Sequence, residues 1–293
     1  MEVVLTVGEI VAPVFLLAAI GYIWVQLGFE YQIQFVTRMA MTLSIPALVF
    51  TSLMKTEISA EALTKISLAA VVGYAGVTVL IYLLTRLARL EIRTYLAPLI
   101  FGNTGNLGLP LAYFAFGDVG LGYAVVVFAI MAVYSFTFGV WLVSGGGSLI
   151  KVVREPLVLA TLAGALFLWQ GWQTPRFLTN TLELLGQIAI PLMLITLGVA
   201  LARLKPSRIG RTVWLSLLKA AICIGVAWAV GLWFQLDPVA FGVLVLQIST
   251  PVAVTSYLLA EKYGADSDAV AGLVVTSTLL SVGIIPLTLV FLL

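Results

Sequence analysis

The chain has 293 residues, of which 62% are hydrophobic and only 10% are charged. An average water-soluble domain has about 25% charged residues, so this sequence lacks the polar side chains that cover a soluble fold. The net charge of +2 gives no indication of nucleic-acid binding. One cysteine and no histidine exclude a disulfide framework, a Cys/His metal site and histidine-based catalysis.

Ten long apolar runs predict ten membrane-spanning helices, because a helix needs about 20 apolar residues to cross the hydrocarbon core. We therefore expect an all-α integral membrane protein in an inner or plasma membrane, in contact with lipid. In chain order the predicted spans are 5–27, 33–54, 64–86, 94–115, 119–143, 156–173, 178–202, 212–235, 239–260 and 269–292.

The basic residues predict the orientation of these spans, since cytoplasmic loops of membrane proteins are enriched in Lys and Arg. If the N-terminus is outside, only Lys55, Lys65 and Arg176 of the 15 basic residues lie on the outer side. We expect both termini to be non-cytoplasmic, which requires an even number of spans.

Eight of the 11 prolines form four pairs in the same order in the two halves of the chain, with offsets between 140 and 145 residues. The pairs are Pro13 with Pro156, Pro46 with Pro191, Pro98 with Pro238, and Pro110 with Pro251. Each half contains five spans, an odd number, so the halves have opposite orientations in the membrane. This inverted repeat is typical of secondary transporters. The predicted boundaries are 1–144 for the first repeat, 145–155 for a short cytoplasmic linker and 156–293 for the second repeat.

The fourth span contains three glycines, two asparagines and a proline within 102–110, which interrupt a helix by propensity alone. Unwound backbone is tolerated in a membrane only where protein or a water-filled cavity satisfies it. We expect two half-helices, the second beginning at Pro110, whose amino end attracts a small anion such as a carboxylate. The predicted substrate-binding residues here are Asn103, Thr104, Gly105, Asn106, Gly108 and Pro110.

The ninth span repeats this arrangement with different residues. Ser249 and Thr250 before Pro251 predict an N-cap followed by the first helical position, and Gln247 adds an amide. For the two hydroxyl residues taken singly, close packing of membrane helices is the simpler interpretation. In an inverted repeat the two interruptions face each other across a pseudo-two-fold axis.

Two charged residues fall inside predicted spans. For Glu183, two interpretations remain open: a proton-coupling carboxylate, or a residue at the wet outer rim beside Arg176. For Lys219, about two turns into its span, we expect the ammonium to reach the inner interface. The chain has no phosphate-binding loop, nucleophile elbow or zinc-protease motif, so we expect neither an enzyme nor an ATP-driven pump.

Residues 103–111, N-T-G-N-L-G-L-P-L, resemble the N-x-G-x-x-G-x-P-L signature of the auxin efflux carrier family, in its prokaryotic branch. Residues 45–50, 190–198 and 251–286 are also similar to that family. The resemblance implies ten helices in two inverted repeats, a fold shared with bile-acid/sodium symporters, with broken helices four and nine crossing. It further implies a dimerising scaffold of helices one, two, six and seven, a moving domain of the other six, and organic anions as substrates. The short linker lacks the long hydrophilic loop of the plant carriers, so a plant-style role is not expected.

The sequence thus predicts a secondary transporter of a small organic carboxylate, acting by an elevator-type alternating-access cycle at the crossed interruptions. The alternatives are a sodium-coupled symporter of the bile-acid type, with Asn and backbone carbonyl ligands for the ion, and a channel-like or sensory membrane protein. No cofactor is expected, and the coupling ion, H⁺ or Na⁺, is left open.

Overall fold

The computed structural model describes residues 2–56, 58–144, 156–204 and 209–293, and the predicted linker at 145–155 lies outside these ranges. All regular secondary structure in the described part is helical. The elements are α1 (Glu2–Gln26), α2 (Ile33–Met39), η1 (Ala40–Ser44), α3 (Ile45–Lys55), α4 (Ala60–Leu87), α5 (Ile92–Ile100), η2 (Thr104–Gly108), α6 (Leu109–Tyr134), η3 (Ser135–Gly139), α7 (Val140–Ser144), α8 (Pro156–Gln170), α9 (Arg176–Gln187), α10 (Ala189–Arg203), α11 (Ile209–Trp233), α12 (Pro238–Ser249), α13 (Val254–Tyr263) and α14 (Ser267–Leu292), where η denotes a π-helical segment.

Seven helical segments in the described part are long and apolar enough to cross a membrane, and two shorter apolar helices, α8 and α12, accompany them. Large apolar side chains such as Leu16, Leu87, Trp169 and Phe291 are exposed on the outside of the molecule. Such a surface is stable in contact with lipid and unfavourable in water. The fold is that of an all-helical integral membrane protein.

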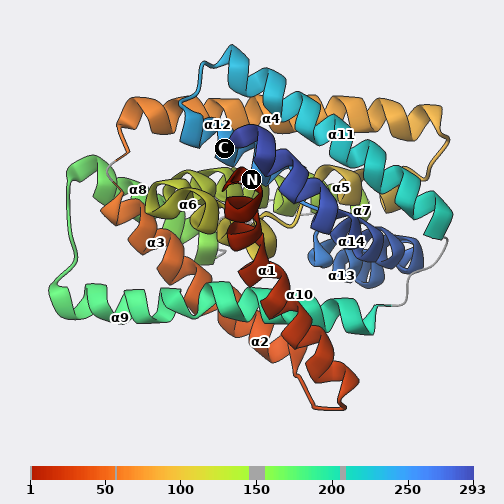
Figure 1. The fold of residues 1–293 in the computed structure, drawn as a ribbon, viewed down its shortest axis with the longest axis horizontal. Coiled ribbons are helices and arrows are strands. Elements are labelled where there is room, and N and C mark those ends of the chain that lie inside the picture. The colour runs from red at the N-terminus through yellow and green to blue at the C-terminus, as the bar shows by residue number, and fades with distance from the viewer. Residues whose placement is uncertain (1, 57, 145–155, 205–208) are drawn as a thin grey trace.

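Helix packing defines two groups, one of α1, α3, α8, α9 and α10 and the other of α4, α5, α6, α11, α12 and α14. The helices α4 and α11 run side by side along one edge of the molecule, and α9 and α10 run along the opposite edge (Figure 1). The larger hydrophobic core joins α4, α5, α6, α11, α12 and α14, whereas a smaller core lies where α1 meets α10, α6 and α14. The larger core also includes residues of α3, α8 and α10, such as Leu48, Leu157 and Met193, so the two groups pack against each other.

Glycines bring α1 and α10 into backbone contact. A Cβ on Gly21 would lie 2.0 Å from the Ile195 carbonyl oxygen, and one on Gly198 would lie 1.7 Å from the Ala18 carbonyl oxygen. Small residues at such positions let membrane helices pack by close van der Waals contact. The α1–α10 pair is thus a tightly packed unit.

Three irregular points divide the long helices. The π-helical segment η1 ends two residues before Pro46, and α10 begins two residues before Pro191. Proline favours such irregular points because it removes an intrahelical hydrogen bond. Gly117, inside α6, has a φ of 63°, a conformation that favours glycine. This turn falls between the predicted fourth and fifth spans.

Candidate functional site

Two extended segments, each lying between two helices, meet in the interior of the molecule. The helix α5 ends at Ile100, and helical backbone resumes at Thr104 with η2, which continues into α6. In the second half of the chain α12 ends at Ser249 and α13 begins at Val254. We call the meeting point of residues 101–103 and 250–253 the crossover.

The crossover is held by an isolated antiparallel bridge between Gly102 and Val252. The Asn103 N–H donates to the Pro251 carbonyl at 2.7 Å, and the Ala253 N–H donates to the Phe101 carbonyl at 3.5 Å. These bonds satisfy backbone groups that unwound helices would otherwise leave unpaired in a low-dielectric interior. As a result, two helix carboxyl ends and two helix amino ends point toward one location.

Two glycines make this close approach sterically feasible. A Cβ on Gly102 would lie 2.1 Å from Thr250 Oγ1, and a Cβ on Gly108 would lie 2.3 Å from Gln247 Oε1. Any larger residue at either position would push the two interruptions apart. The glycines that the sequence places in the fourth span thus serve the contact between the two halves as well as breaking a helix.

Three buried polar atoms at the crossover have no hydrogen-bond partner. They are Asn103 Nδ2, Thr104 Oγ1 and Gln247 Oε1. The side chains carrying them are at most 5% exposed. Leaving a buried donor or acceptor unsatisfied costs about 1–3 kcal/mol, and buried polar groups in native proteins are usually paired. The cluster therefore has the unused bonding capacity of a ligand site.

The helical amino end at Asn103 adds further donors to this cluster. Helical backbone begins at Thr104, so the first N–H groups of the helix lie at residues 104–106. The prediction that this half-helix begins at Pro110 is therefore wrong. Pro110 is at the second position of α6, two residues after the end of η2 and six residues after Thr104. The first N–H groups of a helix have no intrahelical acceptor and carry partial positive charge. Asn106 lies half-buried on the same turn, as does Gly105.

The predicted N-cap role of Ser249 and Thr250 is wrong. Ser249 is the last residue of α12 and Thr250 is its C-cap, while Ala253 is the residue that precedes α13. Their hydroxyls donate backward, Thr250 Oγ1 to the Gln247 carbonyl at 2.7 Å and Ser249 Oγ to the Leu246 carbonyl at 3.2 Å. Pro251 ends the helix because it has no N–H to donate. This side of the crossover is a carboxyl end, with partial negative charge.

Lys219 is the residue that the sequence analysis misplaced. Its side chain does not reach the inner interface: it is 2% exposed, and its Nζ donates to the Thr250 carbonyl at 2.9 Å. Lys219 is the only charged side chain among the buried residues that the structure describes. A lysine inside an apolar helix was the available signal, since an intramembrane charge is costly and most often functional.

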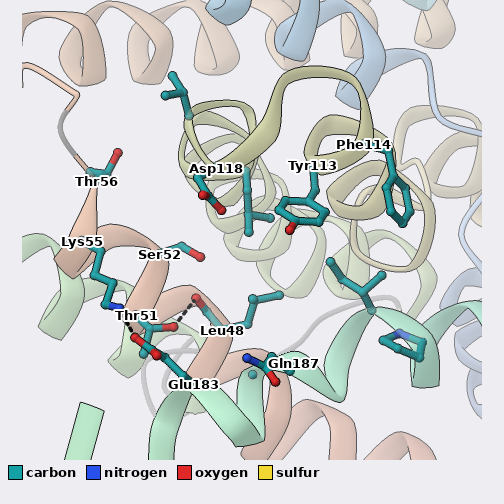
Figure 2. A pocket seen from close by; sticks show the side chains of 15 residues that line it. Leu48, Thr51, Ser52, Lys55, Thr56, Tyr113, Phe114, Asp118, Glu183 and Gln187 are labelled. Carbon is teal, nitrogen blue, oxygen red and sulfur yellow. Dashed lines mark hydrogen bonds and ion pairs between the residues drawn. The ribbon is translucent and has the colours of Figure 1, made fainter. Parts of the chain in front are cut away.

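A cavity of about 770 Å³ lies between the two helix groups (Figure 2). Thr51, Ser52 and Lys55 line it from α3, Tyr113 and Asp118 from α6, and Glu183 and Gln187 from α9. Tyr113, at the cavity, follows Asn103, at the crossover, by ten residues, which correspond to about 15 Å along a helix. Of these residues, only Glu183 is a candidate functional residue from the sequence, because a cavity between distant helices has no local sequence pattern.

Glu183 lies at this cavity and not at the crossover. Its carboxylate forms an ion pair with Lys55 (Figure 2), in place of the Arg176 considered from the sequence. The two side chains are 31% and 55% exposed. Glu183 is thus a partly exposed, ion-paired carboxylate, and both interpretations made from the sequence stay predictions. The crossover leaves Asn103, Thr104 and Gln247 as candidate substrate-binding residues.

Comparisons with known proteins place the chain among membrane transporters. A family model described as "Membrane transport protein" matches residues 6–147 and 141–289. A protein of Rhizobium meliloti named "Putative malonate transporter" is 26% identical over 198 residues, which are 62% of this chain and 61% of the relative, less than two thirds of its length. Proteins named as uncharacterized transporters, from Methanothermobacter thermautotrophicus and Methanocaldococcus jannaschii, are 29% and 23% identical, each match covering 95% of this chain and 96% of the relative.

Proposed function

Because the chain belongs to the membrane transport protein family, we propose that it carries a small organic carboxylate across the membrane. This family is the auxin efflux carrier family that its motifs resemble. It is a transport protein and not an enzyme. The name of the Rhizobium relative makes malonate the first substrate to test. The substrate binds at the crossover, beside Asn103, Thr104 and Gln247.

The observation that carries this proposal is the unpartnered polar cluster beside a helix amino end. A carboxylate accepts hydrogen bonds, and Asn103 Nδ2 is a buried donor with no acceptor. The N–H groups at 104–106 add partial positive charge at the same point. The one buried charge in the described chain, that of Lys219, is also positive. This electrostatic environment favours an anion over a cation.

The cavity provides the route by which the substrate reaches this cluster. Its walls come from α3 and α9 on one side and from α6 on the other, so it lies between the two helix groups. The amino-terminal part of α6 connects the cavity lining to η2 and hence to Asn103. Movement of α6 and its partners along α3, α9 and α10 exposes the crossover alternately to the two sides, in an elevator-type cycle.

Ten spans in two inverted repeats accommodate this cycle. Each interrupted helix counts as one span. The first such span consists of α5, η2 and the first part of α6, and the second consists of α12 and α13. The packing of α1 on α10 and of α8 on α3 supports the repeat, since each pair joins the first span of one half to the second span of the other. These four spans form the scaffold and carry the contact of a homodimer. The distribution of the basic residues supports a non-cytoplasmic position for both termini.

Counterflow in proteoliposomes tests the proposal. Vesicles loaded with unlabelled malonate should accumulate labelled malonate transiently and saturably, because a carrier exchanges substrate faster than it returns empty. Asn103→Ala and Asn106→Ala should reduce this exchange at least tenfold while the folded protein is retained. Asn180→Ala, which removes an exposed amide on α9, is the matched control and should behave as wild type.

Two results would contradict the proposal. Label that passes through the protein without counterflow would indicate a channel. Wild-type exchange in both Asn103→Ala and Asn106→Ala would remove the assignment of the substrate to the crossover.

A further inference from the structure

A lysine is buried beside the end of an interrupted helix, without an acidic partner. The ion pairs found among the described residues are Lys55–Glu183 and Lys65–Glu61, and neither involves Lys219. Its Nζ donates to the Thr250 carbonyl at 2.9 Å and lies 3.8 Å from Cys223 Sγ. A buried charge is costly unless it is paired or bonded. The position of this ammonium therefore calls for a functional explanation.

The partner of Lys219 is a helix carboxyl end. Thr250 is the C-cap of α12, so its carbonyl is among the last, unpaired carbonyls of that helix. These groups together carry about half a negative charge, which a nearby cation stabilises. In secondary transporters the carboxyl ends of interrupted helices and unwound carbonyls coordinate coupling cations. Lys219 Nζ is thus located where a transported cation would be expected.

The surroundings of the ammonium have the chemistry of a site for a small hard cation. A cavity of about 10 Å³ is lined by Lys219, by Pro251 and by five hydroxyl residues, which are Ser216, Ser249, Thr250, Ser277 and Ser281. Hydroxyl and carbonyl oxygens suit hard ions, and the sulfur of Cys223 lies farther from Nζ, at 3.8 Å, than the Thr250 carbonyl oxygen at 2.9 Å. The remaining space holds about one water molecule at most, so the lysine side chain fills the site.

We propose that Lys219 is a tethered monovalent cation that replaces a coupling sodium ion at the carboxyl end of α12. Transport by this chain is then independent of sodium, in contrast to a sodium-coupled symporter with the same crossover. The inference rests on the proposed function, because it assigns the coupling at the same site. Removing the side chain should empty the site and convert it into one that binds a free monovalent cation.

Two substitutions separate a cation site from a packing role. Lys219→Ala deletes the ammonium and three methylenes and leaves room for an ion, whereas Lys219→Met fills most of the space without charge. Lys262→Ala, at an exposed lysine on α13, is the control. Each purified protein is heated in NaCl, methylammonium chloride or choline chloride at equal ionic strength, since choline is too large for the site.

Wild type, Lys262→Ala and Lys219→Met should unfold at the same temperature in all three salts. Lys219→Ala should be destabilised in choline and regain several degrees in NaCl or methylammonium chloride. In proteoliposomes, exchange by Lys219→Ala should fall at least tenfold in choline and recover in part with sodium, while wild-type exchange should be equal in sodium and choline.

Three results would overturn the inference. These are a wild-type protein whose stability or exchange requires sodium, a Lys219→Ala protein that no small cation stabilises, and a Lys219→Met protein stabilised as much as Lys219→Ala. If Lys219→Ala does not fold, the exchange activity of the wild type in sodium and in choline still tests the inference: equal exchange supports it and a requirement for sodium contradicts it. Failure of the proposed function appears differently, as absent malonate counterflow together with an intact thermal pattern.

Discussion

The two interruptions that meet at the crossover are built from different residues and are satisfied to different degrees. The first, at 101–103, ends with Asn103 and is followed by Thr104, and Asn103 Nδ2 and Thr104 Oγ1 have no hydrogen-bond partner. The second, at 250–253, is bonded from outside: Lys219 donates to the Thr250 carbonyl, and Ser277 Oγ accepts the Val252 N–H at 3.0 Å. The two interruptions therefore differ in the number of side-chain groups left free to bind a ligand.

This difference assigns a separate task to each half of the molecule. The second interruption is a platform whose backbone is already satisfied by neighbouring helices. The first carries the free donors, and Gln247 Oε1, which lies against Gly108, is the contribution of the second half to them. In the proposed transporter, one half therefore fixes the geometry of the crossover and the other provides most of the contacts to the substrate. Substitutions at one interruption at a time separate these two roles.

Gly102→Ala should have the largest effect, because it separates the two interruptions. The new Cβ would lie 2.1 Å from Thr250 Oγ1 and 3.0 Å from the Thr250 carbonyl oxygen. Overpacking of this kind costs about 1–3 kcal/mol or more, and we expect lower thermal stability together with loss of malonate exchange. Gly225→Ala, at a position with nothing within 4 Å, is the control and should be neutral or stabilising. A Gly102→Ala protein as stable as Gly225→Ala would show that the close contact is not needed.

Ser277→Ala should have an intermediate effect and act on the satisfied side alone. It removes the acceptor of the Val252 N–H and leaves that buried group unpaired, at a cost of about 1–3 kcal/mol. Thermal unfolding should therefore occur at a lower temperature, whereas malonate affinity should change little. Ser67→Ala is the control, because that hydroxyl only donates within its own helix, to the Leu63 carbonyl. A large loss of affinity in Ser277→Ala with unchanged stability would reverse the assignment of the two sides.

The smallest effect is expected at the Lys55–Glu183 ion pair. Both side chains are partly exposed at the cavity, and such pairs contribute at most about 1 kcal/mol. Glu183→Gln should leave malonate exchange within about twofold of wild type, with an unchanged pH dependence. A loss of proton-dependent exchange in Glu183→Gln would instead identify this carboxylate as a proton-coupling group.

Much of the helical framework was predictable because apolar length and punctuation residues are local signals. The helices α1, α4, α11 and α14 lie within a few residues of the predicted spans, and the turn at Gly117 falls between two of them. The membrane character and the transporter family were also correct. The two proline-marked points at Pro46 and Pro191 coincide with irregular helix.

The details of the site were less predictable because they depend on which helices become neighbours. Thr250 ends a helix rather than beginning one. The sequence did not predict this, because a proline at position 251 is compatible with either role. Lys219 was expected at the interface because its sequence position does not reveal that a helix carboxyl end lies beside it. The partner of Glu183 is 128 positions away in sequence, at Lys55, and no periodicity indicates such a contact.

The most direct test of the central claim is a calorimetric titration of purified protein with malonate, in wild type, Asn103→Ala and Asn180→Ala. Asn103 Nδ2 has no hydrogen-bond partner, so loss of this donor breaks no hydrogen bond, and we expect Asn103→Ala to unfold at the same temperature as wild type. Wild type and Asn180→Ala should bind malonate with equal affinity, and Asn103→Ala should bind at least tenfold more weakly. Equal malonate affinity in all three proteins would contradict the claim that the first interruption provides the contacts to the substrate.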